Sequence, residues 1–219
     1  MSKDTSTTYI QQIFQAALQR IEAHEEELGQ LDAAAGDGDH GRTMVRGLRA
    51  AVVAISSTDT ASASNDGPVG MVIMQAGTAF ADAAGGASGP LLGMFMMNIG
   101  QKIGANEVDA TLVHTAFDAG LNAILKLGKA KPGDKTMIDT LSPFVTALGD
   151  AANDGQSLAD AWDTALAAAQ TGAESTAEMM AKKGRASKLR ERSIGHLDPG
   201  AMSMLYMLQA TGSVLSSCV

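Results

Sequence analysis

Apolar side chains recur every three to four positions along most of this chain, which is the spacing of one face of an α-helix. Near the N-terminus, for example, Ile10, Phe14 and Ile21 follow this spacing. The pattern predicts roughly eight helices and no confident strand, so the expected fold class is all-α. The predicted helices cover residues 7–30, 44–55, 69–84, 91–103, 108–127, 136–152, 157–180 and 201–213.

Short polar, basic or glycine-rich stretches separate the predicted helices. Asp198-Pro199-Gly200 is typical of a helix start, with an aspartate cap and proline at the first helical position. Short connectors favour antiparallel neighbours in an up-and-down bundle, so alternate connectors share one end and several could surround one ligand. No linker divides the chain, and one domain over residues 1–219 is expected. The other connectors are residues 56–67, 85–90, 128–134 and the basic, irregular stretch 182–196.

The composition narrows the range of partners. The chain has 219 residues, of which 45% are hydrophobic and 18% charged, as expected for a packed globular protein. Its net charge of −8 argues against nucleic acid, which requires a basic face, but not against a nucleotide bound with Mg²⁺. Cys218 is the only cysteine, and the sequence contains neither a signal peptide nor an apolar run long enough for a membrane span. A cytoplasmic protein is expected.

The strongest chemical signal is a group of three aspartates within eight residues, Asp32, Asp37 and Asp39. Clustered carboxylates repel one another unless a cation lies among them, and their hard oxygens suit Mg²⁺ or Ca²⁺. Gly36 and Gly38 permit the turn that would aim these side chains at one point. Bound Mg²⁺ usually keeps positions open for phosphate oxygens, so the loop predicts a metal-bridged nucleotide site.

Two other interpretations of the aspartate loop are not favoured. Its glycine spacing matches the dinucleotide fingerprint, but an alanine-rich stretch replaces the required strand, and aspartates would repel bare phosphate. An EF-hand needs a glutamate at the twelfth position, whereas counting from Asp37 or Asp32 reaches Leu48 or Thr43. Helix caps and turns formed by the aspartates remain an alternative, although they account for one aspartate better than for three.

Three further segments are candidates for phosphate contacts. The small residues 85–90 open a helix, where backbone N–H groups favour anions, although an ordinary turn would look the same. Residues 128–136 imitate a P-loop, but Asp134 occupies the position of the P-loop lysine, so a P-loop is rejected. Two interpretations of this segment remain: it contributes contacts to a nucleotide, or its lysines are simply solvated. A basic patch is either an arginine clamp on phosphate or a solvated surface; it comprises Lys182, Lys183, Arg185, Lys188, Arg190 and Arg192.

Together these segments resemble the nucleotide-binding L subunit of dihydroxyacetone kinase, which also occurs as the C-terminal domain of single-chain forms. The matching segments follow the family order through nearly the whole chain. They are Leu31–Gly41, Gly85–Leu91, Lys131–Met137, the Gly-Arg-Ala-Ser stretch 184–187 and Glu191–Ala201.

The resemblance implies an eight-helix antiparallel barrel with ADP or ATP at one end. It implies that Asp32, Asp37 and Asp39 hold two Mg²⁺ ions that bridge the phosphates. It also implies a separate K-type subunit that holds dihydroxyacetone, and in some versions an M-type phosphohistidine phosphocarrier that recharges ADP. The cofactor-binding positions carried over, with Arg42 included, are His40, Gly41, Arg42, Thr43, Ala87, Ser88, Gly128, Met137, Arg185, Asp198, Pro199 and Gly200.

The leading hypothesis is a phosphoryl-transfer subunit of a kinase for dihydroxyacetone or a related short keto-sugar. No residue is an obvious general base, which agrees with an acceptor that arrives on another chain. The family pattern is not followed at Arg42, Lys188 and Arg190, and these departures leave the identity of the partner and of the sugar open. The oligomeric state is also open, and a homodimer is one option. Two other hypotheses are a non-catalytic nucleotide-sensing adaptor and a simple Ca²⁺-binding helical protein.

Overall fold

The computed structural model describes residues 3–34, 36–56 and 69–217, and the regular secondary structure within these ranges is helical. Eight of the helices are long. They are α1 (Lys3–Ala23), α3 (His40–Ser56), α4 (Val69–Ala84), α5 (Ser88–Ile103), α6 (Ala110–Gly128), α7 (Met137–Asn153), α8 (Leu158–Ser175) and α9 (Pro199–Ser216). The short helix α2 (Glu25–Ala33) and the 3₁₀ helices η1 (Thr176–Glu178) and η2 (Arg185–Ser193) lie between them.

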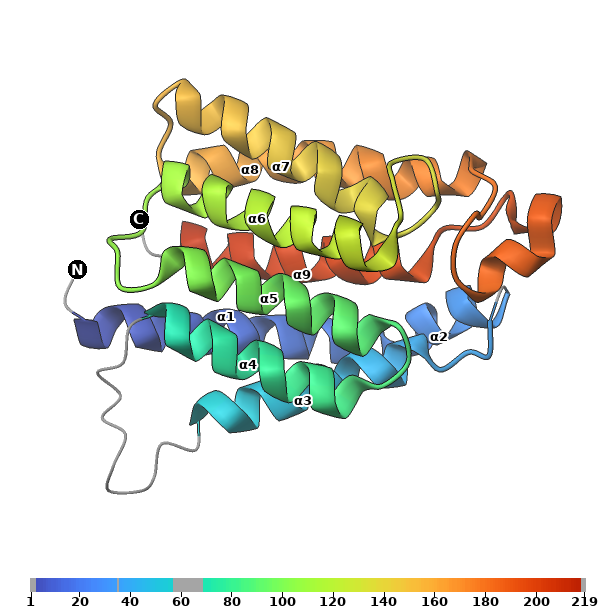
Figure 1. Cartoon of the computed structure of the whole chain (residues 1–219), viewed down its shortest axis with the longest axis horizontal. Helices are drawn as coiled ribbons and strands as arrows, with labels where there is room; N and C mark the ends of the chain where they lie inside the picture. The colour runs from blue at the N-terminus through green and yellow to red at the C-terminus, as the bar shows by residue number, and fades with distance from the viewer. Residues whose placement is uncertain (1–2, 35, 57–68, 218–219) are drawn as a thin grey trace.

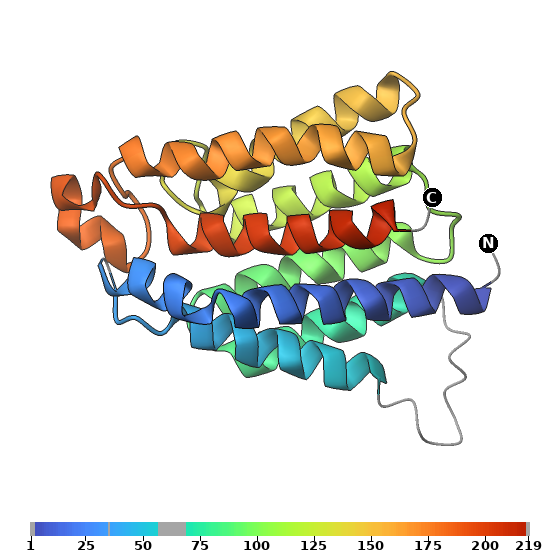
Figure 2. The same cartoon turned by 180° about the vertical axis from the view of Figure 1, so that it is seen from behind.

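The long helices form a closed ring. Each packs against the next in chain order, from α1 and α3 through to α8 and α9, and α9 closes the ring against α1. Consecutive helices run in opposite directions along one common axis (Figure 1), and the view from behind shows α1 and α9 side by side (Figure 2). The prediction of an eight-helix antiparallel barrel is confirmed.

The connectors of the barrel lie at two opposite ends. One end, which we call the loop end, carries the aspartate loop (Asp32 at the end of α2 together with residues 36–39) and the connectors 85–87, 129–136 and 176–198; it lies on the right of Figure 1. The start of α1, the end of α9 and the connectors 104–109 and 154–157 lie at the other end. Helices α3, α5, α7 and α9 all begin at the loop end, so four positively polarised helix N-termini point the same way. The prediction that alternate connectors share one end is confirmed.

The interior of the barrel is apolar. Four aromatic side chains meet there with ring centroids 4.9 to 5.5 Å apart, namely Phe95, Phe117, Phe144 and Trp162. The Trp162 indole N–H donates to the Leu208 carbonyl at 3.0 Å, so this buried polar group is paired. A cavity of about 180 Å³ within the barrel is lined almost wholly by apolar side chains. Charged ligands would lose their hydration in such an interior, which directs polar chemistry to the ends.

Some helix boundaries differ from the sequence prediction. The predicted helix 7–30 is interrupted at His24, whose Nδ1 lies 2.8 Å from the Arg20 carbonyl oxygen, and α2 restarts after it. The predicted helix 157–180 leaves α-geometry after Ser175, and the basic stretch 182–196 contains η2 with a kink at Arg190. The predicted connector 56–67 lies, except for Ser56, outside the described residues. Among the described helices, none combines the length and apolarity that a membrane crossing requires.

Candidate metal and phosphate site

The three aspartates of the loop meet at one point. Asp32 lies in the last turn of α2, and Asp37 and Asp39 lie in the loop before α3; one carboxylate oxygen from each is within 4.8 Å of the others. Oxygens on opposite sides of a divalent cation are separated by roughly 4 to 5 Å, twice the metal–oxygen distance. This donor set therefore fits a hard divalent cation such as Mg²⁺.

The backbone explains how the loop gathers its carboxylates. The Asp39 N–H donates to Asp32 Oδ2 at 3.0 Å, which ties the two ends of the loop together. Gly38 has φ of 74°, a conformation that costs an ordinary residue energy, and a Cβ on Gly36 would overlap the Asp32 carboxylate. Gly38 thus adopts the positive φ that the sequence suggested, whereas Gly36 does not, and its missing side chain instead leaves room for the Asp32 carboxylate.

Arg185 reaches the same loop from η2. Its guanidinium forms an ion pair with the Asp37 carboxylate, although the Arg185 side chain is 60% and the Asp37 side chain 50% exposed. Desolvation would raise the pKa of Asp37, but the hydrogen bond and charge of Arg185 outweigh it and lower this pKa below its ordinary value. The pKa of Arg185 is raised by the same hydrogen bond and by all three aspartates. The basic stretch and the acidic loop therefore face each other.

His40 links the loop to the start of α9. It is the first residue of α3, it is 9% exposed, and its Nε2 lies 2.9 Å from the Ser203 hydroxyl. Ser203 in turn donates to the Gly200 carbonyl at 3.1 Å. Burial lowers the pKa of His40, with the charges of Asp32 and Asp39 opposing the change, which favours the neutral imidazole. In this structure His40 holds two of the candidate segments together.

The first turn of α3 fixes its packing on α2. Gly41 and Thr43 are buried, and the Thr43 N–H donates to the Asp39 carbonyl at 2.9 Å. A Cβ on Gly41 would overlap the carbonyl oxygen of Glu25, so only glycine lets α3 approach α2 this closely. Arg42, between them, is exposed and points along the outer face of α3.

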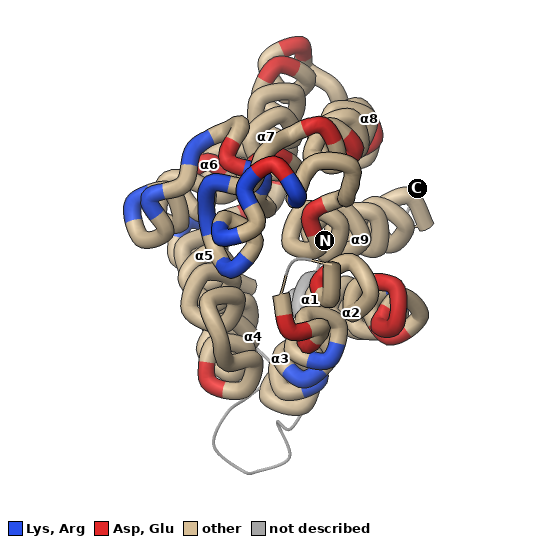
Figure 3. The backbone as a smooth tube through the Cα atoms, turned by 90° about the vertical axis from the view of Figure 1, so that its right-hand side faces the viewer, with Lys and Arg blue, Asp and Glu red and all other residues tan. Residues whose placement is uncertain are grey.

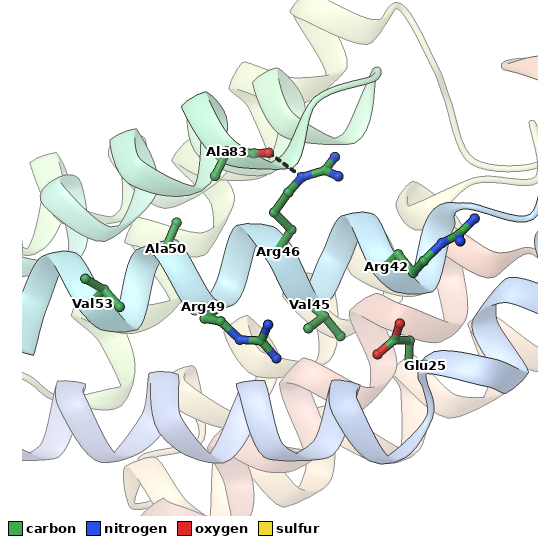
Figure 4. Close-up of a pocket in the computed structure, with 8 residues that line it drawn as sticks. All are labelled: Glu25, Arg42, Val45, Arg46, Arg49, Ala50, Val53 and Ala83. Carbon is green, nitrogen blue, oxygen red and sulfur yellow. Dashed lines mark hydrogen bonds between the residues drawn. The ribbon is translucent and has the colours of Figure 1, made fainter.

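A groove of about 520 Å³ lies on that outer face (Figure 4). Among the predicted site residues, Arg42 alone lines it. Arg46 donates to the Ala83 carbonyl at 2.7 Å, and Arg49 pairs with Glu22 at 2.6 Å, so both are engaged within the protein. None of the three aspartates lines this groove.

The predicted cap at Asp198 is present at the start of α9. Asp198 Oδ1 accepts a hydrogen bond from the Ala201 N–H at 2.7 Å, and Pro199 is the first helical residue. A Cβ on Gly200 would lie 3.7 Å from the Met137 backbone nitrogen, which places Gly200 beside the start of α7. Burial raises the pKa of Asp198 to about 7, opposed by backbone N–H groups and by the charge of Lys135.

The remaining predicted residues form a second group. Ala87 and Ser88 start α5 after Gly85 and Gly86, which both have positive φ. Gly128 ends α6, where a Cβ would lie 3.3 Å from a methyl group of Leu91 on α5. Arg46 of α3 donates to the Ala84 carbonyl before the glycine pair, and so connects this group to the helix that follows the aspartate loop.

Two lysines of the loop end have roles that the sequence interpretation missed. Lys135 is 3% exposed and donates to backbone carbonyls, so the interpretation of solvated lysines is wrong for this residue. Lys182 donates to the Gly133 carbonyl at 2.9 Å. Thr136 and Asp139 form a capping box at the start of α7, a signal that is visible in the sequence, whereas the burial of Lys135 is not.

Carboxylates that could hold a divalent cation, a facing arginine and helix N-termini that favour anions share one end of the barrel. This combination is typical of a helical protein that binds metal-bridged phosphate. Comparison with known proteins identifies the family. The DAK2 domain matches residues 34–213, and the chain belongs to the DAK2 domain family.

The curated relatives include single-chain kinases and separate subunits. The chain is 39% identical to L-erythrulose kinase of Pectobacterium atrosepticum over 92% of its own length but only 34% of that protein. It is also 39% identical to the ADP-binding subunit DhaL of the PEP-dependent dihydroxyacetone kinase of Escherichia coli, covering 84% of this chain and 85% of that subunit. The chain thus spans about a third of the erythrulose kinase and most of the DhaL subunit.

A solved structure shows the same fold. The dihydroxyacetone kinase of C. freundii, in complex with AMP-PNP and Mg²⁺, superposes with a TM-score of 0.66 and 27% sequence identity. The match covers 92% of this chain and 33% of that one. The helical barrel is therefore shared with a portion of a kinase whose structure holds a nucleotide analogue and Mg²⁺.

Proposed function

We propose that this chain is the nucleotide-binding, phosphoryl-transferring unit of a kinase for dihydroxyacetone or a related short keto-sugar such as erythrulose. One observation carries the proposal: Asp32, Asp37 and Asp39 present oxygens within 4.8 Å of one another, in a chain of the DAK2 domain family. The names of the relatives, which are kinases of dihydroxyacetone or erythrulose, support it.

In this proposal the three aspartates hold two Mg²⁺ ions, which neutralise phosphate oxygens of ADP or ATP when bound. Arg185, already directed at Asp37, covers the transferring phosphoryl group. The N-termini of α3, α5, α7 and α9 supply backbone N–H groups to the nucleotide. The residues proposed to line it are His40, Gly41, Arg42, Thr43, Ala87, Ser88, Gly128, Met137, Arg185, Asp198, Pro199 and Gly200.

The proposed reaction site is divided between two protein units. The histidine nearest the aspartates, His40, is buried and bonded to Ser203, so it is poorly placed to take a proton from a sugar hydroxyl. A K-type unit therefore holds the sugar and brings its hydroxyl in line with the phosphate. The same proposal includes four further points: an M-type phosphohistidine carrier as a second partner, a homodimer, a single domain over residues 1–219 and a cytoplasmic location.

The test is a coupled assay of sugar phosphorylation with dihydroxyacetone and with erythrulose. Each sugar is supplied with Mg²⁺ and ATP, or with ADP and a phosphohistidine donor, in the presence and absence of a K-type subunit. We expect no turnover by this chain alone and turnover when the K-type subunit is added. Robust phosphorylation by this chain alone would refute the divided site. Nucleotide binding with no turnover under any of these conditions would favour the nucleotide-sensing adaptor.

A further inference from the structure

Lys135 is placed where a lysine is costly. Its side chain is 3% exposed, and burial lowers the pKa of the ammonium group, opposed by the charge of Asp198. Its backbone has φ of 62°, a left-handed conformation that glycine or asparagine adopts with less strain. A residue that carries both costs is held by its surroundings, and such positions are frequent at functional sites.

The surroundings of Lys135 are the two flanks of one loop. The segment 176–198, which we call the cap loop, leaves α8 and returns to α9 with its ends side by side. The Asp198 N–H donates to Thr176 Oγ1 at 3.0 Å, and the Gly195 N–H donates to the Ala177 carbonyl at 2.8 Å. These bonds form a neck, and η2 with Arg185 lies beyond it, next to the aspartate loop.

The ammonium group of Lys135 bridges both flanks of this neck. On the outgoing flank it donates to the carbonyls of Thr176 at 2.7 Å and Met179 at 3.3 Å. On the returning flank it donates to the carbonyls of Ser193 at 2.7 Å and of His196. Carbonyls just beyond the end of α8 carry partial negative charge that favours a cation. Four carbonyl oxygens from the two flanks of the cap loop thus converge on one buried charge.

We propose that Lys135 is a positioning residue, which closes the neck of the cap loop and thereby holds Arg185 against the aspartate loop. The connector 129–136 would then control a phosphate-binding arginine that follows it by some fifty positions. The consequence for nucleotide binding rests on the proposed function, whereas the consequence for the cap loop does not.

The test compares Lys135→Met, which keeps the length and apolar stem of the side chain but removes the charge, with Lys131→Met, an exposed lysine of the same connector. Hydrogen exchange of the nucleotide-free protein is measured first. We expect faster exchange of the amides in residues 181–197 in Lys135→Met, and no change in Lys131→Met. Unchanged protection of the cap loop in Lys135→Met would overturn the proposal whether or not the protein binds nucleotide.

A double-mutant cycle then separates positioning from general stability. The affinity for Mg²⁺-ADP is measured by calorimetry for Lys135→Met, Arg185→Met and the double variant. We expect each single change to weaken binding at least about tenfold, because each removes the charge-assisted contact of Arg185 with the nucleotide. The double variant should then bind no more weakly than Arg185→Met, since that contact is already lost. Additive losses would overturn the positioning role. Wild-type protein that binds no Mg²⁺-ADP would instead count against the proposed function, and the exchange measurement would still decide the role of Lys135.

Discussion

At the scale of single residues, the aspartate cluster was predictable because its members are close in sequence and glycines fix the turn between them. The pairing of Arg185 with Asp37 was not, because it depends on how the cap loop returns over the barrel. The burial of Lys135 was hidden for the same reason, since a lysine beside glycine and aspartate ordinarily indicates a solvated loop. Contacts between residues close in sequence could be predicted directly, whereas contacts between residues that only the fold brings together could not.

Asp37→Asn tests the metal assignment. Removing one carboxylate charge should weaken Mg²⁺-dependent ADP binding at least about tenfold, because the cation loses a charged ligand. The fold should persist, since Asp37 is exposed and lies outside the core. Calorimetry with ADP, with Mg²⁺ and with excess chelator, measures the effect, and Asp150→Asn on α7 is the control with the same charge change. Equal ADP affinity with and without metal in the wild type would contradict the assignment.

Asp198→Asn tests the raised pKa at the start of α9. The pKa of Asp198 is about 7 in the folded protein and near 3.8 when unfolded, so the folded form alone keeps the proton between these values. The stability from this group is therefore complete below about pH 4 and is lost as pH rises towards 7. Asparagine retains the cap but does not titrate. The wild-type free energy of unfolding, relative to Asp198→Asn, should fall by up to about 1.4 kcal/mol per pH unit in this range.

Urea unfolding of both proteins at several pH values between 4 and 8 measures that difference. Two stability curves that run parallel across this range would show that Asp198 does not titrate as the structure indicates. A steeper fall of the Asn variant would contradict the sign of the effect.

At the scale of elements, helical periodicity located all eight long helices, because apolar positions recur along each of them at helical spacing. Helix α9 differs from a one-sided helix, since all of its residues 201–208 are buried. The break at His24 was missed because the apolar spacing continues across it to the buried Leu28. The closeness of α2 and α3 was also not visible in the sequence, although it depends on Gly41. The pattern predicts which face a helix buries, and small residues decide how near its neighbour comes.

Gly41→Ala tests the packing of α2 on α3. The added Cβ would overlap the Glu25 carbonyl, so the two helices must separate, at a cost of roughly 1 to 3 kcal/mol in stability. Because α2 carries Asp32 and α3 follows Asp39, Mg²⁺-ADP binding should weaken as well. Gly100→Ala is the matched control, since its Cβ would overlap the Gly70 carbonyl at the opposite end of the barrel. Thermal unfolding and calorimetry together should show stability lost in both variants and affinity lost only in Gly41→Ala.

At the scale of the whole molecule, an acidic protein presents basic residues at its loop end, where Figure 3 shows lysine and arginine around the cap loop and the start of α3. Arg42, Lys188 and Arg190 are exposed there. In the proposed divided site this end must face the K-type unit, so its charge acts on a docking partner as well as on phosphate. Charges at the edge of an interface change the rate of association more than the strength of the final contacts.

Reversing these charges should therefore slow docking more than it weakens nucleotide binding. For Lys188→Glu and Arg42→Glu we expect the association rate constant with a K-type subunit to fall several-fold at low salt, with a smaller change in Mg²⁺-ADP affinity. The difference should shrink as salt screens the exposed charges. Stopped-flow association at several ionic strengths measures it, with Lys102→Glu at the far end of α5 as a control of equal charge change. If Lys102→Glu slowed association as much as Lys188→Glu, net charge alone would account for the effect. That result would contradict the proposal that the loop end is the docking face.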